Sequence, residues 1–306
     1  MLQKVQSVVH DLATSVIAGQ LVPGDPVPTV RVLAEQVGCS PGTAARAHAA
    51  LREAGIITGP PRSRAVVTAD GVARALAMSA TVGTVRLSGS DDPALDLLLV
   101  AVGPAVERAA GGRGSVAGLG LLAQGVVDAA AVHLRDARTG RSNDTFVRRV
   151  FGGEPAVLVH LWSREQGIVV PKGNPLGISG VADLGSTRIA WRGPGTGSRL
   201  LLSRLLRDAC VTPRPDGEPC DSHLGVAVAV ATGAADAGLA VRAVAEAVDA
   251  DFLPVEWEDF ELALSPDSVM LLAPILDVLA STTVQDRLSR AGGYDLRRSG
   301  ELRVAA

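Results

Sequence analysis

The chain has 306 residues, of which 47% are hydrophobic and only 3% aromatic, and its formal net charge is −3. This length corresponds to two domains of ordinary size, and the composition predicts cores built from Ala, Val and Leu. The charge excludes a bulk binder of polyanions, yet it is uneven. Residues 1–80 contain seven basic and five acidic residues, a net charge of +2, so the remainder carries −5. A mildly basic N-terminal segment joined to an acidic remainder predicts that contact with phosphates is confined to the N-terminal segment.

The cysteines and the apolar runs bear on the compartment. Cys39, Cys210 and Cys220 form no CxxC pair and show no metal-ligand spacing, which indicates a reducing environment. The first twenty residues lack a positive segment followed by an unbroken apolar core. The apolar run at 94–106 is too short to span a membrane. We therefore expect a cytoplasmic protein with no membrane partner.

The first forty residues predict two helices. Apolar residues recur at helical spacing from Val5 to Ile17, and Gly19 ends this first helix. A turn at 23–25 follows, and Thr29 is expected to cap a second helix with Leu33 facing inward.

A third helix and two short strands complete the N-terminal segment. Ser40 is the expected N-cap of this helix, Pro41 its first residue, and Gly55 its end. Two short helices joined by a tight turn predict a helix-turn-helix, whose second helix enters the major groove of DNA. Ser40, Thr43 and Arg46 are expected to face outward, where hydroxyls meet phosphates and Arg reaches a guanine edge. Strands at 56–57 and 65–67 would then flank a wing that carries two further DNA-binding candidates, Arg62 and Arg64.

Residues 1–70 resemble the winged helix-turn-helix of GntR-type bacterial regulators. The matching residues, at fixed spacings, are Gly19, Leu21, Pro23-Gly24-Asp25, Pro28-Thr29-Val30-Arg31, Leu33-Ala34, Gly38, Ser40, Thr43, Leu51 and Gly55-Ile56. The resemblance implies a double-stranded DNA operator as partner, a homodimer, and DNA contacts from Arg31, Ser40, Thr43 and Arg46. Two features depart from the family: His48 replaces an aromatic residue, and the wing lacks a central glycine.

Beyond residue 81, predicted strands alternate with predicted helices. This alternation predicts an α/β domain with mainly parallel sheets. The expected strands are 84–88, 167–170, 188–191, 235–239 and 252–257, and the clearest helices are 197–209 and 223–232.

Small hydroxyl residues stand at the strand-to-helix junctions of this region. They are Ser90, Ser115, Thr196, Ser198 and Ser222. Helix N-termini carry free N–H groups and partial positive charge, so several of them converging on one cleft would bind an anion. Each residue taken alone is better explained as an ordinary N-cap than as a ligand-binding residue.

Residues from about 84 to 265 resemble the periplasmic-binding-protein-like domain fused to helix-turn-helix readers, related to type 2 solute-binding proteins of the molybdate group. The matching segments are 87–98, 127–143, 173–178, 191–206 and 222–240. The resemblance implies that the five hydroxyl residues face the ligand, and it adds Arg192, Arg199 and His223 as further candidates.

The two resemblances together imply an α/β protein with an N-terminal winged helix-turn-helix and a two-lobed type 2 periplasmic-binding-protein-like domain. The expected domains are 1–75 and 81–306. Lobe I would comprise about 81–160 and 255–306, and lobe II about 165–250. The chain would cross between the lobes near 160–164 and 251–254.

This organisation predicts a ligand-responsive transcription regulator. Its first-choice ligand is an oxyanion such as molybdate or tungstate, and an organic metabolite, such as a carboxylate or a cofactor precursor, is the alternative. A third reading is an enzyme or ligand carrier whose N-terminal domain serves assembly. Asp91-Asp92 is interpreted as a turn before Pro93, and GPGTG at 193–197 lacks the Lys of a phosphate-binding loop. We expect no catalytic residues, no cofactor and no metal.

Overall fold

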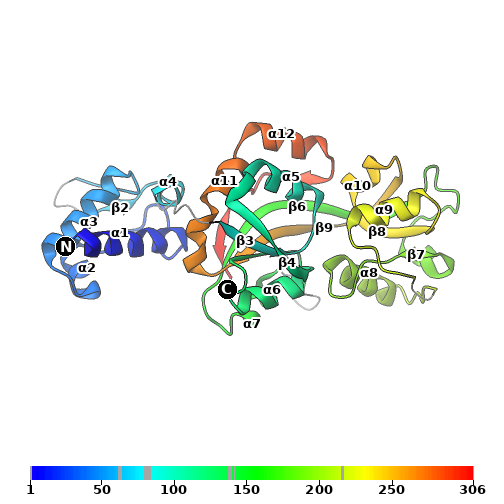
Figure 1. Ribbon diagram of the computed structural model, residues 1–306, viewed down its shortest axis with the longest axis horizontal. Coiled ribbons are helices and arrows are strands. Elements are labelled where there is room, and N and C mark those ends of the chain that lie inside the picture. Colours follow the sequence, from blue (N-terminus) through cyan, green and yellow to red (C-terminus); the bar gives the residue numbers. More distant parts are fainter. Residues whose placement is uncertain are drawn as a thin grey trace.

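A computed structural model describes residues 2–60, 64–78, 84–136, 140, 142–214 and 217–305. It places three bodies in a row: a helical N-terminal domain, then a central lobe, then a distal lobe (Figure 1). Arg62 lies outside the described residues. Among the helices described, none combines the length and the apolar character needed to cross a membrane.

The N-terminal domain is a winged helix-turn-helix. Its elements are α1 (Leu2–Ile17), α2 (Val30–Val37), α3 (Pro41–Glu53), β1 (Ile57–Thr58), β2 (Val66–Val67) and α4 (Gly71–Met78). Both predicted caps are confirmed, because the side chains of Thr29 and Ser40 accept hydrogen bonds from Val32 N and Thr43 N. Strands β1 and β2 pair antiparallel and form the base of the wing.

Lobe I, the central lobe, combines an early and a late part of the chain. The early part contains β3 (Val85–Gly89), α5 (Pro93–Val102), η1 (Gly103–Ala105), β4 (Val106–Arg113), α6 (Ser115–Ala123), β5 (Ala129–Val132) and α7 (Asp144–Val150). The late part contains η3 (Pro266–Leu272), α11 (Ala273–Leu279), α12 (Thr282–Arg290), β10 (Tyr294–Asp295) and β11 (Leu302–Val304). Helices α5, α11 and α12 lie on one side of the sheet and α6 and α7 on the other (Figure 1).

Lobe II, the distal lobe, is built from the middle of the chain. It contains η2 (Val181–Ser186), β7 (Ile189–Ala190), α8 (Gly197–Asp208), α9 (His223–Ala231), β8 (Ala237–Val241) and α10 (Arg242–Ala247). Two long strands, β6 (Val157–Val170) and β9 (Asp251–Leu264), run through both lobes and join them.

The sheet differs from the mainly parallel arrangement that we expected. The strand order is β4-β3-β5-β9-β6-β8-β7, and β10 and β11 also pair with β6. Only the outer pairs, β3 with β4 and β5, and β7 with β8, are parallel. The central pair β6–β9 is antiparallel because the chain leaves lobe I on one strand and returns on the other. The segments 167–170 and 252–257 belong to these two strands and are not separate strands.

The N-terminal domain and lobe I share one apolar core. Val8 and Leu12 of α1, Leu76 of α4 and Leu272 at the end of η3 belong to a single buried cluster. Such a shared core resists independent rotation of the two bodies. The packing of α1 and α4 against η3 therefore joins the N-terminal domain to lobe I.

Candidate ligand cleft and DNA interface

Only some of the residues predicted to contact DNA are exposed to solvent. Arg31, Arg46 and Arg64 are exposed, as a reader of DNA requires. Thr43, by contrast, is only 5% exposed, and its hydroxyl lies 2.8 Å from the Ser40 hydroxyl. The expectation that Thr43 faces outward is therefore wrong, because the cap of α3 uses its side chain internally.

His48, which departs from the family pattern, has a structural environment. Its side chain is 3% exposed, and its Nε2 lies 2.9 Å from the carbonyl oxygen of Pro28. Burial lowers the pKa of His48 below its ordinary value. The imidazole thus ties α3 to the residue that precedes the cap of α2.

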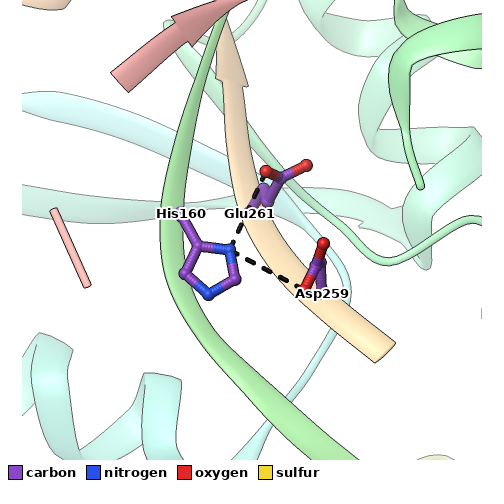
Figure 2. A group of neighbouring side chains, drawn as sticks. All are labelled: His160, Asp259 and Glu261. Carbon is purple, nitrogen blue, oxygen red and sulfur yellow. Dashed lines mark ion pairs between the residues drawn. The ribbon is translucent and has the colours of Figure 1, made fainter. Parts of the chain in front are cut away.

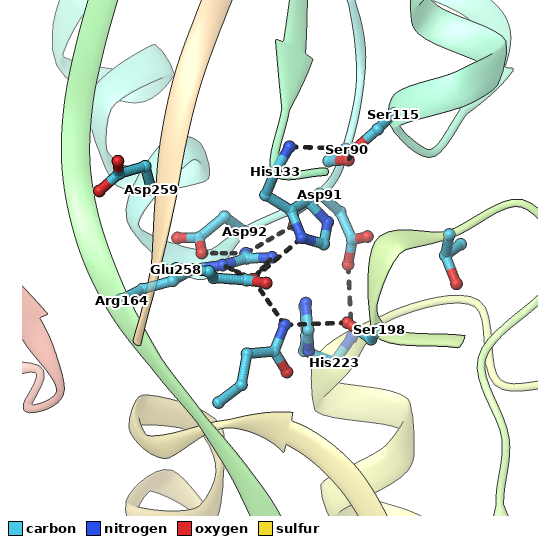
Figure 3. A network of polar contacts seen from close by, with 12 residues as sticks. Ser90, Asp91, Asp92, Ser115, His133, Arg164, Ser198, His223, Glu258 and Asp259 are labelled. Carbon is cyan, nitrogen blue, oxygen red and sulfur yellow. Dashed lines mark hydrogen bonds and ion pairs between the residues drawn. The ribbon is translucent and has the colours of Figure 1, made fainter. Parts of the chain in front are cut away.

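In lobes I and II, a polar network lies where the lobes meet (Figure 3). Asp91, in the loop between β3 and α5 of lobe I, accepts a hydrogen bond from Arg192 of lobe II at 2.6 Å. Its second oxygen accepts the backbone N–H of His223, the first residue of α9, at 3.3 Å. A carboxylate of lobe I therefore occupies the kind of helix N-terminus that binds anions.

The hydroxyl residues predicted to bind the ligand lie near this network, but they have partners within the protein. Ser90 and Ser115 lie 2.7 Å apart, and Ser115 also accepts the N–H of His133. Ser198 accepts a hydrogen bond from Gln166 at 3.1 Å. Thr196 and Ser222 are the N-caps of α8 and α9, as expected if these residues serve as ordinary caps.

The three remaining candidates, two arginines and a histidine, occupy different surroundings. The guanidinium of Arg199 stacks on Trp191, 3.9 Å from the ring centre. His223 is 1% exposed, and its Nδ1 has no hydrogen-bond partner among the described residues. Arg192 also donates to the carbonyl oxygens of Cys220 and Asp221, so lobe II holds its guanidinium firmly.

Arg164 on β6 is the centre of the network and is fully buried. It donates to Asp92 of lobe I and, at 2.8 Å, to Glu258 on β9. Its guanidinium also lies over the ring of Phe260, 4.6 Å from the centroid. Glu258 in turn lies 2.9 Å from His133 Nδ1 and accepts Gln166 at 2.7 Å. These contacts concentrate buried charge on the strands that join the lobes.

Protonation in this network depends on which partner each carboxyl meets. Burial alone would raise the pKa of Glu258, but His133 and Arg164 hold it well below its ordinary value. Burial raises the pKa of Asp92 despite the neighbouring Arg164. Burial would likewise raise the pKa of Asp91, but His223 and Arg192 lower it. Positive neighbours therefore dominate the pKa of Glu258 and Asp91, whereas burial dominates that of Asp92.

The lowered pKa of His223 predicts how the free energy of unfolding changes as the pH falls. Burial lowers this pKa well below the ordinary value of 6.5, so the folded protein keeps His223 neutral while the unfolded chain takes up a proton. Stability is therefore fully present above pH 6.5 and falls below it, by up to about 1.4 kcal/mol per pH unit from this residue. We expect His223→Gln to reduce the loss between pH 7 and pH 5, measured by urea unfolding at both values. An equal loss in the variant and the wild type would contradict this assignment.

The lobes are in direct contact in this arrangement. A Cβ atom added at Gly197, the first residue of α8, would lie 2.2 Å from Cε1 of His133 in lobe I. A Cβ atom at Gly114 of lobe I would lie 3.1 Å from the carbonyl oxygen of Gly195 in lobe II. The structure is thus a closed form of the two lobes.

A cavity of about 280 Å³ remains beside this contact. Its charged walls include Arg135, Arg204 and Glu256, and its apolar walls include Phe146 and Leu201. Glu256 accepts from Arg204 at 2.7 Å and lies 3.1 Å from Arg135. None of the eight predicted ligand-binding residues lines this cavity.

Sequence reasoning missed the charged residues of the crossing strands. Arg164, Gln166 and Glu258 interrupt apolar segments, and that interruption was the available signal. Asp91 was noticed, but it was interpreted as part of a turn. Its role depends on Arg192, about a hundred residues later, which no local pattern reveals.

The geometry defines a class of protein: a winged helix-turn-helix joined to a two-lobed ligand-binding domain. Residues 4–67 match the family described as bacterial regulatory proteins, gntR family, and residues 100–277 match the PBP superfamily domain. The second match covers more than half of the chain, which therefore belongs to the PBP superfamily.

Two uncharacterized proteins and several solved structures are similar to parts of this chain. The uncharacterized protein YvgK of Bacillus subtilis is 33% identical over 195 residues, which are 62% of this chain and 63% of YvgK. An uncharacterized protein of Clostridium pasteurianum is 31% identical over 86 residues, covering 27% of this chain and 76% of that protein.

Among solved structures, the sulfate-binding protein SubI of Mycobacterium tuberculosis has a TM-score of 0.48 at 13% identity, covering 69% of this chain and 86% of SubI. Full-length OxyR from Pseudomonas aeruginosa has a TM-score of 0.46 at 14% identity, covering 93% and 96%. These likenesses are too remote to indicate a ligand.

Proposed function

We propose that this protein is a transcription regulator whose operator binding responds to a small ligand held between lobes I and II. The observation that carries the proposal is the core shared by the winged helix-turn-helix and lobe I, beside a cleft closed by Asp91 and Arg192. A ligand that changes how the lobes meet would shift the placement of the DNA-binding helices. Ligand and DNA would then alter each other's affinity by the same factor. We further propose that it acts in the cytoplasm as a homodimer on a two-fold symmetric operator.

For the ligand, we favour an organic anion over a bare oxyanion. Molybdate or tungstate would need several donors, and the contact between Ser90 and Ser115 already uses the hydroxyl proton of one of them. The Asp91 carboxylate would also repel an oxyanion that approached Arg192. The 280 Å³ cavity instead has three arginines, at positions 135, 204 and 207, against two carboxylates, Glu256 and Glu258, and its apolar walls include Phe146 and leucines, which suits an acid with an apolar part.

Thermal-shift screening separates the two ligand classes, because a ligand that binds only the folded protein raises Tm. We expect no change with molybdate, tungstate or sulfate, and an increase with members of a set of carboxylic, phosphoric and phosphonic acids. Stabilisation by molybdate or tungstate at micromolar concentration, without any by organic acids, would restore the oxyanion as the ligand.

Arg46 provides the test of DNA binding. Arg46→Ala is expected to weaken binding to a duplex that the wild-type protein selects from a random library by about 5- to 150-fold, the loss typical of a base-contacting Arg. The matched control is Arg148→Ala, which removes the same charge from an exposed position on α7 of lobe I. Fluorescence anisotropy at fixed salt measures both variants. Equal affinities for Arg46→Ala and the wild type would instead favour the reading in which the N-terminal domain serves assembly.

A further inference from the structure

We propose that His160, Asp259 and Glu261 form a binding site for a divalent transition-metal ion in lobe I. The three residues lie on the central strands β6 and β9, and His160 is the direct register partner of Glu261. One ligand atom from each residue lies within 4.8 Å of the others. Figure 2 shows the imidazole of β6 facing both carboxylates of β9.

The side chain of His160 provides independent evidence that an ion binds at this site. His160 is 1% exposed, and neither of its ring nitrogens has a hydrogen-bond partner among the described residues. A buried polar group left in this state costs free energy, so such groups are nearly always satisfied by protein, water or an ion. Nδ1 is the nitrogen that faces the carboxylates (Figure 2).

The distances fit an ion better than a direct hydrogen bond. Nδ1 lies 4.0 Å from Asp259 Oδ1 and 3.9 Å from Glu261 Oε1, beyond hydrogen-bonding range. Two ligands of one tetrahedral zinc ion are separated by about 3.4 Å when the metal–ligand bonds have ordinary lengths. A contraction of roughly half an ångström would therefore bring each carboxylate oxygen to this separation from Nδ1, and the ligand atoms of Asp259 and Glu261 already lie within 4.8 Å of each other.

Surrounding groups orient the two carboxylates and leave a local negative charge. Asn143 and Arg303 donate to Glu261, and Ser163 donates to Asp259, as the outer partners of metal ligands do. Four carboxylates and two guanidiniums meet here: Asp144, Asp259, Glu261, Glu301, Arg298 and Arg303. Their formal sum of −2 would be neutralised by one divalent cation.

The ligand set indicates the class of ion. One imidazole and two carboxylates suit Zn²⁺, Mn²⁺, Fe²⁺ or Co²⁺, whereas Mg²⁺ and Ca²⁺ prefer oxygen ligands alone. The Asp259 side chain is 26% exposed and gives the ion a path to solvent. A metal ion here would tie β6 to β9, the two strands that join the lobes, within lobe I. This site does not depend on the identity of the cleft ligand.

The test uses the full-length protein after EDTA treatment and desalting, with Co²⁺ as a spectroscopic probe and Zn²⁺ in equilibrium dialysis. We expect one equivalent of metal, a visible Co²⁺ spectrum without a thiolate charge-transfer band, and a Tm that rises with metal concentration. His160→Gln and Asp259→Asn are each expected to weaken binding at least tenfold. Asp259→Asn is the variant expected to fold normally, because its side chain is partly exposed and keeps its shape.

His10→Gln is the matched control, since His10 is an exposed histidine on α1, and it should bind metal like the wild type. Equal uptake by the wild type, His160→Gln and Asp259→Asn would overturn the proposal, as would a thiolate band from the cysteines. Absence of stoichiometric uptake would also overturn it.

Discussion

Arg164→Met is expected to lower the free energy of unfolding of the C-terminal domain by about 3–5 kcal/mol, the usual cost of removing one partner from a buried ion pair. The guanidinium is fully buried between Asp92 and Glu258. Methionine fills similar space but leaves both carboxyls without their strongest positive neighbour. Urea unfolding followed by tryptophan fluorescence measures the change, because all three tryptophans, at positions 162, 191 and 257, belong to this domain.

Arg86→Met is the control that separates the loss of any arginine side chain from the loss of a buried ion pair. Arg86 pairs with Asp128 at 2.8 Å, but its side chain is 48% exposed. Its removal should cost far less than that of Arg164, because solvent screens an exposed ion pair. Adding Glu258→Gln to Arg164→Met should recover part of the loss, because one uncompensated buried charge disappears. A cost for Arg164→Met as small as that for Arg86→Met would contradict the role given to the buried network.

Gly197→Ala is expected to open the cleft of the ligand-free protein. The new methyl group would lie 2.2 Å from Cε1 of His133, whose ring is held by Glu258 and stacks on Phe260 with centroids 5.8 Å apart. Overpacking of this kind costs about 1–3 kcal/mol. The closed population should therefore fall about 5- to 150-fold relative to the open one. Small-angle X-ray scattering should report a larger radius of gyration for the variant.

Gly193→Ala is the matched control from the same loop, because a Cβ atom there meets nothing within 4 Å. Alanine is favourable at the first position of a helix, which residue 197 occupies, and Gly193 is not among the glycines with positive φ, so neither substitution should impair folding. Identical scattering from Gly197→Ala and the wild type would show that His133 and Gly197 do not limit closure. Any organic acid found in the thermal-shift screen should also bind the Gly197→Ala variant more weakly, since closure contributes to its affinity.

The N-terminal domain could be predicted closely because its determinants are local. Thr29 and Ser40 cap their helices through residues three positions later, and Gly38 ends α2 in the left-handed conformation that glycine favours. The prediction was wrong for Thr43, whose hydroxyl the cap of α3 itself uses. That local competition was visible in the spacing, since a cap and the residue three positions later commonly interact.

The long strands β6 and β9 could be predicted only in pieces. Apolar runs marked 167–170, but Arg164, Gln166 and Glu258 broke the pattern toward the crossing. These residues are buried in strands because each meets an opposite charge or an amide from another segment. Strand pairing over about ninety residues has no local signature.

The sequence by itself determined the winged helix-turn-helix, the alternating α/β body, and the hydroxyl residues at the starts of α8 and α9, because propensity, capping and apolar spacing act within a few residues. Only the tertiary structure decided that Asp91 faces Arg192, that Arg164 lies buried between two carboxyls, and that His160 meets Asp259 and Glu261. Buried charges are stable only where distant partners compensate them, so their positions follow from how the lobes assemble and not from any segment alone.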